Sequence, residues 1–128
     1  MRDIKKNWEL LSRTEVYDGS PYIKISVDKV KLPNGKIIDD YHRIEIKDAV
    51  MLLVENEKDE LLVYKEYRHG ISQVSLTFPA GGIEKNESHI DAAKRELLEE
   101  TGYAAASYNI INKYIVSGSY MFSTLCYI

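Results

Sequence analysis

Residues 88–102 constrain the fold more than any other stretch, because the sequence marks both ends of one α-helix there. Ser88 and Asp91 have the spacing at which an N-cap hydroxyl and a third-position acid satisfy free backbone N–H groups. Gly102 can adopt the left-handed conformation that commonly ends a helix. The residues that share the apolar face are Ile90, Ala93, Leu97 and Thr101, with Leu98 at its edge. This face is predicted to pack on a sheet.

The other side of this helix carries three glutamates, Glu96, Glu99 and Glu100. Like charges at these spacings repel by about 0.2–0.5 kcal/mol per pair, and the helix dipole disfavours acids in the last turn by about 0.3–1 kcal/mol. A solvated face is the common interpretation of such a stretch. Carboxylates beside the Gly81 and Gly82 loop are also the hard oxygen ligands that Mg²⁺ or Mn²⁺ prefers. Their unfavourable placement favours a metal site over a solvated face.

An antiparallel hairpin is predicted near the N-terminus. Residues 22–32 alternate apolar with polar side chains, as a half-buried strand does, and residues 36–46 form the return strand. Pro33, Asn34 and Gly35 between them are typical turn residues. Further strands are predicted for residues 49–56, 60–68, 74–78, 108–116 and 120–128, with a turn at Ser117, Gly118 and Ser119 and a loop at Gly81 and Gly82.

Composition excludes several classes of protein. With 128 residues, 45% of them hydrophobic and 29% charged, the chain suits one globular domain. A net charge of −3 with scattered Lys and Arg offers no surface for a nucleic-acid polymer. No stretch approaches the roughly 18 apolar residues of a membrane span, and no secretion signal is evident, so a cytoplasmic protein is expected. The single cysteine, Cys126, excludes an internal disulfide and is expected to be a buried small hydrophobe.

Gly81, Glu87 and residues 95–103 match the pattern G-x5-E-x7-R-E-U-x-E-E-x-G-U, with U apolar, at every specified position. A chance match to seven fixed residues in a chain of this length is rarer than about one in a million. The stretch resembles the Nudix box. The resemblance implies an α/β class protein, a Nudix hydrolase folded as an α/β/α sandwich with a mixed sheet. It also implies divalent cations, Mg²⁺ or Mn²⁺, and a substrate in which a nucleoside diphosphate is linked to another moiety.

The resemblance also implies roles for residues of the box. Glu96, Glu99 and Glu100 are expected to bind the cations together with a backbone carbonyl at Ala80 or Gly81, and Glu99 and Glu100 are expected to carry catalysis. The residues expected to brace the box rather than bind metal are Gly81, Glu87, Arg95 and Gly102.

Segments outside the box indicate which subfamily the chain resembles. The segments "FPAGGIE" and "VYKEYRHGI" and the N-terminal "VYDGSPYIKISVDKVKLPNGK" are similar to the ADP-ribose pyrophosphatases and their close relatives. That similarity implies a dimerising antiparallel β subdomain in residues 1–46, a hydrolase core in residues 47–128, and a homodimer. It makes Arg68 a candidate for the substrate phosphates, and a planar guanidinium suits them. Tyr22 and Tyr41 become candidates for stacking on adenine. Ordinary surface or packing roles remain the alternative for all three.

Three departures from the pattern keep alternatives open. Gly118 stands where the ADP-ribose enzymes usually have a proline, and Glu66 replaces their usual glutamine. The chain ends at Ile128 without a counterpart of their C-terminal catalytic glutamate. The leading hypothesis is hydrolysis of ADP-ribose to AMP and ribose 5-phosphate. The others are hydrolysis of GDP-mannose or another nucleoside diphosphate sugar, and a catalytically impaired module that binds a nucleotide.

Overall fold

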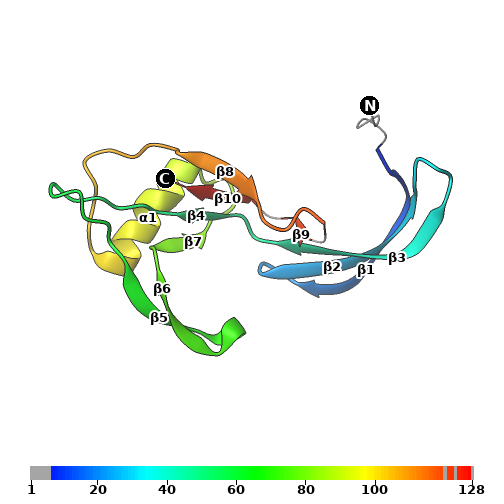
Figure 1. Ribbon diagram of the computed structural model, residues 1–128, viewed down its shortest axis with the longest axis horizontal. Helices are drawn as coiled ribbons and strands as arrows, with labels where there is room; N and C mark the ends of the chain where they lie inside the picture. Colours follow the sequence, from blue (N-terminus) through cyan, green and yellow to red (C-terminus); the bar gives the residue numbers. More distant parts are fainter. Residues whose placement is uncertain (1–6, 120, 123, 128) are drawn as a thin grey trace. The chain divides into compact units, whose positions relative to one another are not determined.

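The structure is a computed structural model that describes residues 7–119, 121–122 and 124–127, the last two segments by their backbone (Figure 1). The chain divides into two compact units. The first contains Met1–Lys47 and Val116–Ser123, and the second contains Asp48–Ile115 and Thr124–Ile128. The side chain of Cys126, expected to be buried, lies outside the described residues.

The first unit is a sheet with the strand order β1-β2-β3-β9. Its strands are β1 (Glu9–Gly19), β2 (Ile23–Lys31), β3 (Ile37–Ile46) and β9 (Met121–Phe122). The first three pair antiparallel, and β9 pairs parallel with β3. The predicted hairpin is confirmed as β2 and β3, and Gly35 in its turn has a φ of +85°, which only glycine adopts without strain.

Strand β1 was not predicted from the sequence. Its side chains are exposed along nearly its whole length, so burial imposes no alternation of apolar and polar residues. Register shifts lie between Leu10 and Ser12 and between Glu15 and Tyr17. Because a bulge adds one residue to a strand, it reverses the face on which later side chains lie. The period-2 pattern is therefore broken twice within β1.

The middle strand β2 buries polar residues that the alternation assigned to the solvent face. Ser26 and Asp28 are buried, whereas Ile23 and Ile25 are only partly so. Arg13 of β1 lies opposite Asp28, and its Nε and Nη2 each donate to one carboxylate oxygen of Asp28 at 2.7 Å. The expected orientation of β2 was wrong because this two-point ion pair satisfies the carboxylate away from water.

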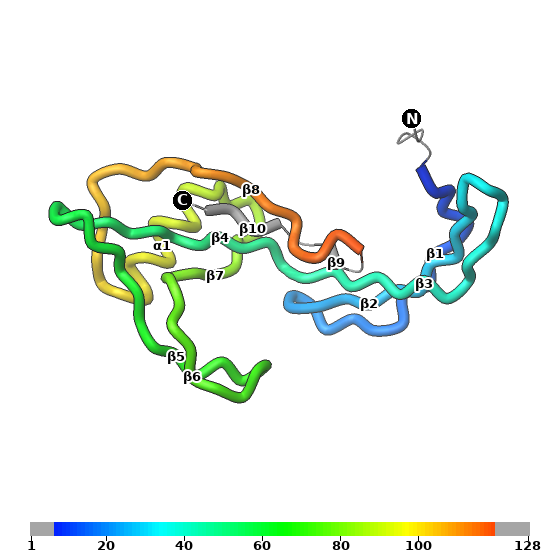
Figure 2. The backbone as a smooth tube through the Cα atoms, in the orientation of Figure 1, coloured from blue at the N-terminus to red at the C-terminus, as the bar shows by residue number. Residues whose placement is uncertain are grey.

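The second unit contains a mixed sheet of order β7-β4-β10-β8 and the helix α1 (Figure 1). Its strands are β4 (Ala49–Met51), β7 (Ala80–Gly82), β8 (Asn112–Ile115) and β10 (Thr124–Tyr127). Strand β4 pairs antiparallel with β7 and parallel with β10. β5 (Tyr64–Arg68) and β6 (Gln73–Thr77) form a separate hairpin, and the 3₁₀ helix η1 (His69–Ile71) connects them. Figure 2 shows the backbone of this hairpin.

Helix α1 (His89–Thr101) is confirmed with both its predicted ends. It packs against β7 and β4, and the core of this unit is Val50, Leu52, Ala92, Ala93 and Leu97. Leu98, predicted at the edge of the apolar face, is exposed, whereas Ala92 is fully buried. The packed face is therefore centred slightly to one side of the predicted one.

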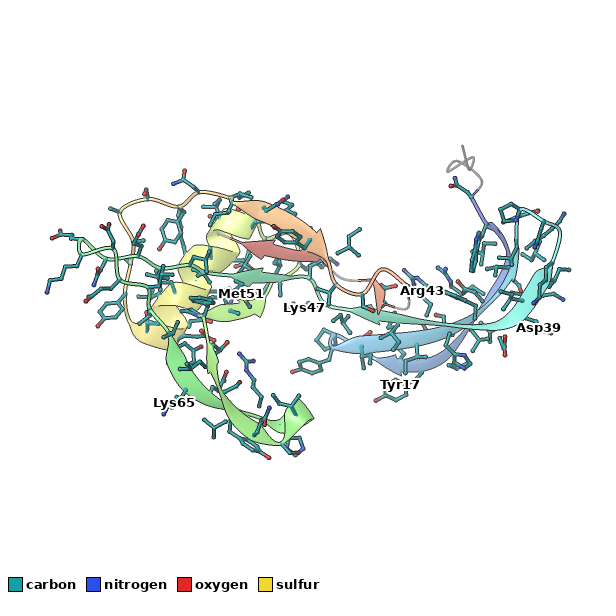
Figure 3. All side chains as sticks on the ribbon, viewed as in Figure 1. Tyr17, Asp39, Arg43, Lys47, Met51 and Lys65 are labelled. Atoms are coloured by element: carbon teal, nitrogen blue, oxygen red, sulfur yellow. The ribbon has the colours of Figure 1, made fainter. Side chains whose placement is uncertain are left out.

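Several strand boundaries were predicted wrongly. Residues 49–56 form a strand only to Met51, labelled in Figure 3, and residues 60–68 only from Tyr64, with an isolated bridge joining Glu55 and Leu61. The expected loop at Gly81 and Gly82 is the strand β7, paired with β4. Glycine has a low intrinsic preference for strands, so the sequence suggested a loop, whereas pairing with β4 determines the local structure.

Candidate active site

The caps of α1 fix where its glutamates lie. The Ser88 hydroxyl accepts a hydrogen bond from the Asp91 N–H at 3.1 Å and donates to the Asp91 carboxylate at 2.6 Å. Gly102, with a φ of +74°, donates its N–H to the Leu98 carbonyl. A helix fixed at both ends presents Glu96, Glu99 and Glu100 in a defined order along its last turns.

The Glu96 carboxylate lies against the backbone of Gly81 in β7. A Cβ atom at position 81 would lie 1.9 Å from the Glu96 Cδ, so any side chain there would overlap the carboxylate. The Glu96 side chain is only 12% exposed. Gly81 is thus required for space rather than for an unusual backbone conformation, and it brings a helix carboxylate onto the strand.

Arg95 connects three glutamates with the strand. Its Nε and Nη2 bond to the two oxygens of Glu87 at 2.8 and 2.9 Å, and Nη2 also donates to the Gly82 carbonyl at 2.9 Å. Its Nη1 bonds to Glu96 at 2.6 Å and to Glu99 at 3.2 Å. These carboxylates, Glu87 first, raise the pKa of Arg95 above its ordinary value. Arg95 and Glu87 therefore link α1, the segment before it and β7.

Glu100 bonds to two other elements of the same unit, β5 and β7. Its Oε2 accepts a hydrogen bond from the Tyr64 hydroxyl of β5 at 2.7 Å and one from the Ala80 N–H of β7 at 3.3 Å. Burial, followed by the bond to Glu100, raises the pKa of Tyr64 to about 12. The Tyr64 hydroxyl therefore keeps its proton and acts as the donor at neutral pH.

Tyr64 was missed by reasoning from the sequence. Its partner lies 36 residues away, beyond the range in which periodicity or spacing gives a signal. With ten tyrosines in the chain, residue type alone does not single it out.

The carboxylate oxygens of these glutamates suit a divalent cation, but the side chains are not arranged as a metal-binding group. Across the part of the chain that the structure describes, no three His, Cys, Asp or Glu side chains form a group ready to bind a metal ion. Glu96 and Glu99 instead share Arg95. The Glu99 side chain is 59% exposed and makes the longest of these bonds, so it can turn toward a cation at little cost. Carboxylate and carbonyl oxygens are the ligands that Mg²⁺ and Mn²⁺ prefer.

The three predicted substrate residues lie in different units. Arg68, in the second unit with the glutamates, bonds through Nη2 to the Thr77 hydroxyl at 2.8 Å and to the Glu66 carboxylate at 2.9 Å. Tyr22 and Tyr41 belong to the first unit. Tyr22 is 77% exposed, whereas the Tyr41 ring lies edge-on to Trp8 at 5.6 Å and its hydroxyl donates to the Ser119 carbonyl.

A cavity of about 670 Å³ lies elsewhere in the second unit. Its lining includes Glu55, Leu62, Leu97 and Tyr103 but none of the predicted site residues. Volume alone therefore does not identify the site, and the carboxylates of α1 remain the candidate. Among the described residues, no helix is long and apolar enough to cross a membrane.

Comparison with known proteins assigns the family. The NUDIX domain matches residues 45–124, and the nucleoside diphosphate sugar hydrolase N-terminal domain matches residues 8–44. The chain belongs to the Nudix family. Its mixed α/β fold, with antiparallel pairing and one α-helix among the described residues, is the Nudix fold. Enzymes of this family generally use divalent metal ions.

The chain is similar to individual proteins that are named as hydrolases of ADP compounds. It is 30% identical over 107 residues to the ADP-ribose pyrophosphatase of Bacillus subtilis (strain 168), covering 84% of this chain and 57% of the relative. It is 35% identical over 79 residues to the ADP compounds hydrolase NudE of Escherichia coli (strain K12), covering 62% of this chain and 42% of the relative. The crystal structure of an ADP compounds hydrolase superposes with a TM-score of 0.82 at 28% identity, covering 95% of this chain and 65% of that one. The chain thus spans between 42% and 65% of the length of these relatives.

Proposed function

We propose that this chain hydrolyses the pyrophosphate bond of ADP-ribose, or of a related nucleoside diphosphate linked to another moiety. ADP-ribose would give AMP and ribose 5-phosphate. The observation that carries the proposal is the meeting of α1 with β7, where the Glu96 carboxylate lies against Gly81 and the Glu100 carboxylate bonds to the Ala80 N–H. This contact puts two helix carboxylates beside the strand backbone, and in our proposal both would supply oxygen ligands to a cation. The similarity to an ADP-ribose pyrophosphatase supports the choice of substrate.

Glu96, Glu99 and Glu100 would hold Mg²⁺ or Mn²⁺, with the carbonyl of Ala80 as a further ligand. A divalent cation bound there would lower the pKa of a bound water and would neutralise charge on the diphosphate. Glu99 and Glu100 are proposed as the catalytic residues because they lie nearest the end of α1 and are the more exposed of the three. Glu87 and Arg95 would hold the helix α1 against the strand β7 through the bonds described above.

Arg68 is proposed to bind the substrate phosphates. Its guanidinium lies at the end of β5, nearly half exposed, and its present partner Glu66 is equally accessible to water. Exposed ion pairs contribute about 0–1 kcal/mol, so a phosphate can displace Glu66 without a large penalty. Tyr22 is proposed to contact the nucleobase with its exposed ring. Tyr41 is proposed for the same role, although its contacts with Trp8 and Ser119 also give it a packing role.

A second candidate is hydrolysis of another nucleoside diphosphate sugar, such as GDP-mannose. Its support is the match of residues 8–44 to the nucleoside diphosphate sugar hydrolase N-terminal domain. The two candidates share the diphosphate chemistry and differ in the base and the sugar that the protein must recognise.

A substrate panel tests both candidates. The 128-residue chain is incubated with ADP-ribose, GDP-mannose or UDP-glucose, with Mg²⁺ or with EDTA, and the nucleoside monophosphate is measured by chromatography. We expect AMP from ADP-ribose in Mg²⁺, none in EDTA, and at least a tenfold lower rate for Glu99→Gln. A preference for GDP-mannose would support the second candidate. Failure to turn over any of the three substrates with Mg²⁺ or Mn²⁺ would refute the proposed activity.

We also propose that the chain forms a homodimer in the cytoplasm, as the resemblance to the ADP-ribose pyrophosphatases implies. The dimer contact would lie in residues 1–46, where Trp8, Leu10 and Val16 are exposed apolar side chains. Light scattering coupled to gel filtration tests the assembly, since a monomer at micromolar concentration contradicts it.

A further inference from the structure

Tyr64 makes a contact that the proposed chemistry does not account for. It is the first residue of β5, in a hairpin that forms its own two-stranded sheet, yet its hydroxyl reaches the last turn of α1. There it donates to the Oε2 of Glu100 at 2.7 Å, the short distance of a hydrogen bond to a charged acceptor.

The second donor to Glu100 reaches the same oxygen. The Ala80 N–H of β7 donates to Oε2 at 3.3 Å. Two donors on one oxygen, one from the strand β7 and one from the hairpin, fix the rotation of the carboxylate and stabilise its negative charge. Glu100 needs such support, because the dipole at the C-terminal end of α1 disfavours an acid there.

We propose that Tyr64 is a positioning residue for Glu100, which its hydroxyl orients as a cation ligand. The inference rests on the proposed function, because it assumes that Glu100 binds a metal ion. Partners that hold metal ligands in place typically affect metal affinity 10- to 100-fold when they are removed. Tyr64 therefore belongs to the site although it binds neither cation nor substrate.

A purely structural role is the competing explanation. The bond from Tyr64 to Glu100 also joins the hairpin to α1, and its loss could simply loosen the hairpin. Tyr67 provides a matched control, because it lies on the same strand, on the opposite face, with its ring packed against His69 at 6.1 Å. Replacing either tyrosine with phenylalanine removes one hydroxyl from β5 and keeps the ring.

Mn²⁺ affinity of the full chain tests the inference. Free Mn²⁺ is measured by electron paramagnetic resonance for the wild type, Tyr64→Phe, Tyr67→Phe, Glu100→Ala and the double variant Tyr64→Phe/Glu100→Ala. We expect Tyr64→Phe to raise the Kd at least tenfold and Tyr67→Phe to change it less than twofold. In the Glu100→Ala background, Tyr64→Phe should change the Kd less than twofold, because the side chain that it positions is gone.

The outcomes separate this inference from the proposed function. If the wild type binds Mn²⁺ and Glu100→Ala binds it at least tenfold more weakly, but Tyr64→Phe binds normally, the positioning role is refuted and the metal site remains. An equal loss from Tyr64→Phe with and without Glu100 would assign Tyr64 a structural role, which thermal unfolding of the same variants would show independently. A wild type that does not bind Mn²⁺ would overturn the metal site and the role of Tyr64 together.

Discussion

Gly81 determines whether Glu96 can lie where it does. We expect Gly81→Ala to push the Glu96 carboxylate off β7, because the new Cβ would lie 1.9 Å from its Cδ. Overpacking of this kind costs about 1–3 kcal/mol in the free energy of unfolding, and we expect Mn²⁺ affinity to fall at least tenfold. Urea denaturation and Mn²⁺ titration measure the two effects.

Gly70→Ala is the matched control, since a Cβ at Gly70 would meet no atom within 4 Å among the described residues. It should change the free energy of unfolding by no more than about 0.5 kcal/mol. If Gly81→Ala behaved like Gly70→Ala, the contact between Glu96 and β7 would not matter to the site.

Two partners of Arg95, Glu87 and Glu99, differ in burial, so they should differ in how much they contribute to the free energy of unfolding. The Glu87 side chain is 14% exposed and makes a two-point contact, whereas Glu99 is 59% exposed and makes one longer bond. We expect Glu87→Gln to lower the free energy of unfolding by about 1–3 kcal/mol and Glu99→Gln by less than about 1 kcal/mol. Urea denaturation in EDTA measures both without metal. A larger loss for Glu99→Gln would contradict the assignment of Glu87 as the brace.

At the level of helices and strands, local signals explain what the sequence could predict. The limits of α1 follow from Ser88, Asp91 and Gly102, which act on backbone groups within a few residues of themselves. The β7 strand could not be predicted, because its glycines favour a loop and only pairing with β4 makes them a strand. The same holds for the site: the box residues were evident from their spacing, whereas Tyr64 contributes through a contact across 36 residues.

The pairing of β1 with β2 should make stability depend on pH through Asp28. The hydrogen bond from Arg13 holds the pKa of Asp28 below its ordinary value, against the opposing effect of burial. Because the unfolded pKa is higher, about 3.9, the stabilisation is fully present above about pH 4. It is lost as the pH falls through the folded pKa. We therefore expect stability to decline below about pH 4.

Asp28→Asn tests this dependence. It should lower the free energy of unfolding by about 1–3 kcal/mol at pH 7, and the remaining decline below pH 4 should be shallower than in the wild type. The control is Asp39→Asn, which alters an exposed residue of β3 that is labelled in Figure 3. It should leave the free energy of unfolding at pH 7 and its decline below pH 4 nearly unchanged. Urea denaturation from pH 7 to about pH 2.5 measures the curves. If the free energy of unfolding of Asp28→Asn depended on pH as steeply as that of the wild type, another group would be the cause.

Across the whole molecule, the family could be recognised from the sequence, whereas the division of the chain into two units required the structure. The box spans 23 residues of contiguous sequence, so its pattern could be recognised without a structure. The division into units could not, because residues 116–123 join the first unit through the pairing of β9 with β3. Such a connection depends on strands more than 70 residues apart, for which periodicity gives no signal.

Cation binding should stabilise the folded chain as a whole. A ligand that binds only the folded state at 100 times its Kd adds about 2.7 kcal/mol, which for a chain of this size raises the Tm by roughly 10 °C. We expect Mg²⁺ to produce such a shift in the wild type and EDTA to abolish it. In Glu99→Gln the shift should largely disappear, whereas Glu57→Gln, which alters an exposed glutamate outside the box, should retain it. Differential scanning calorimetry provides the comparison. A full shift in Glu99→Gln would mean that the cation binds elsewhere, and the carboxylates of α1 would lose their proposed role.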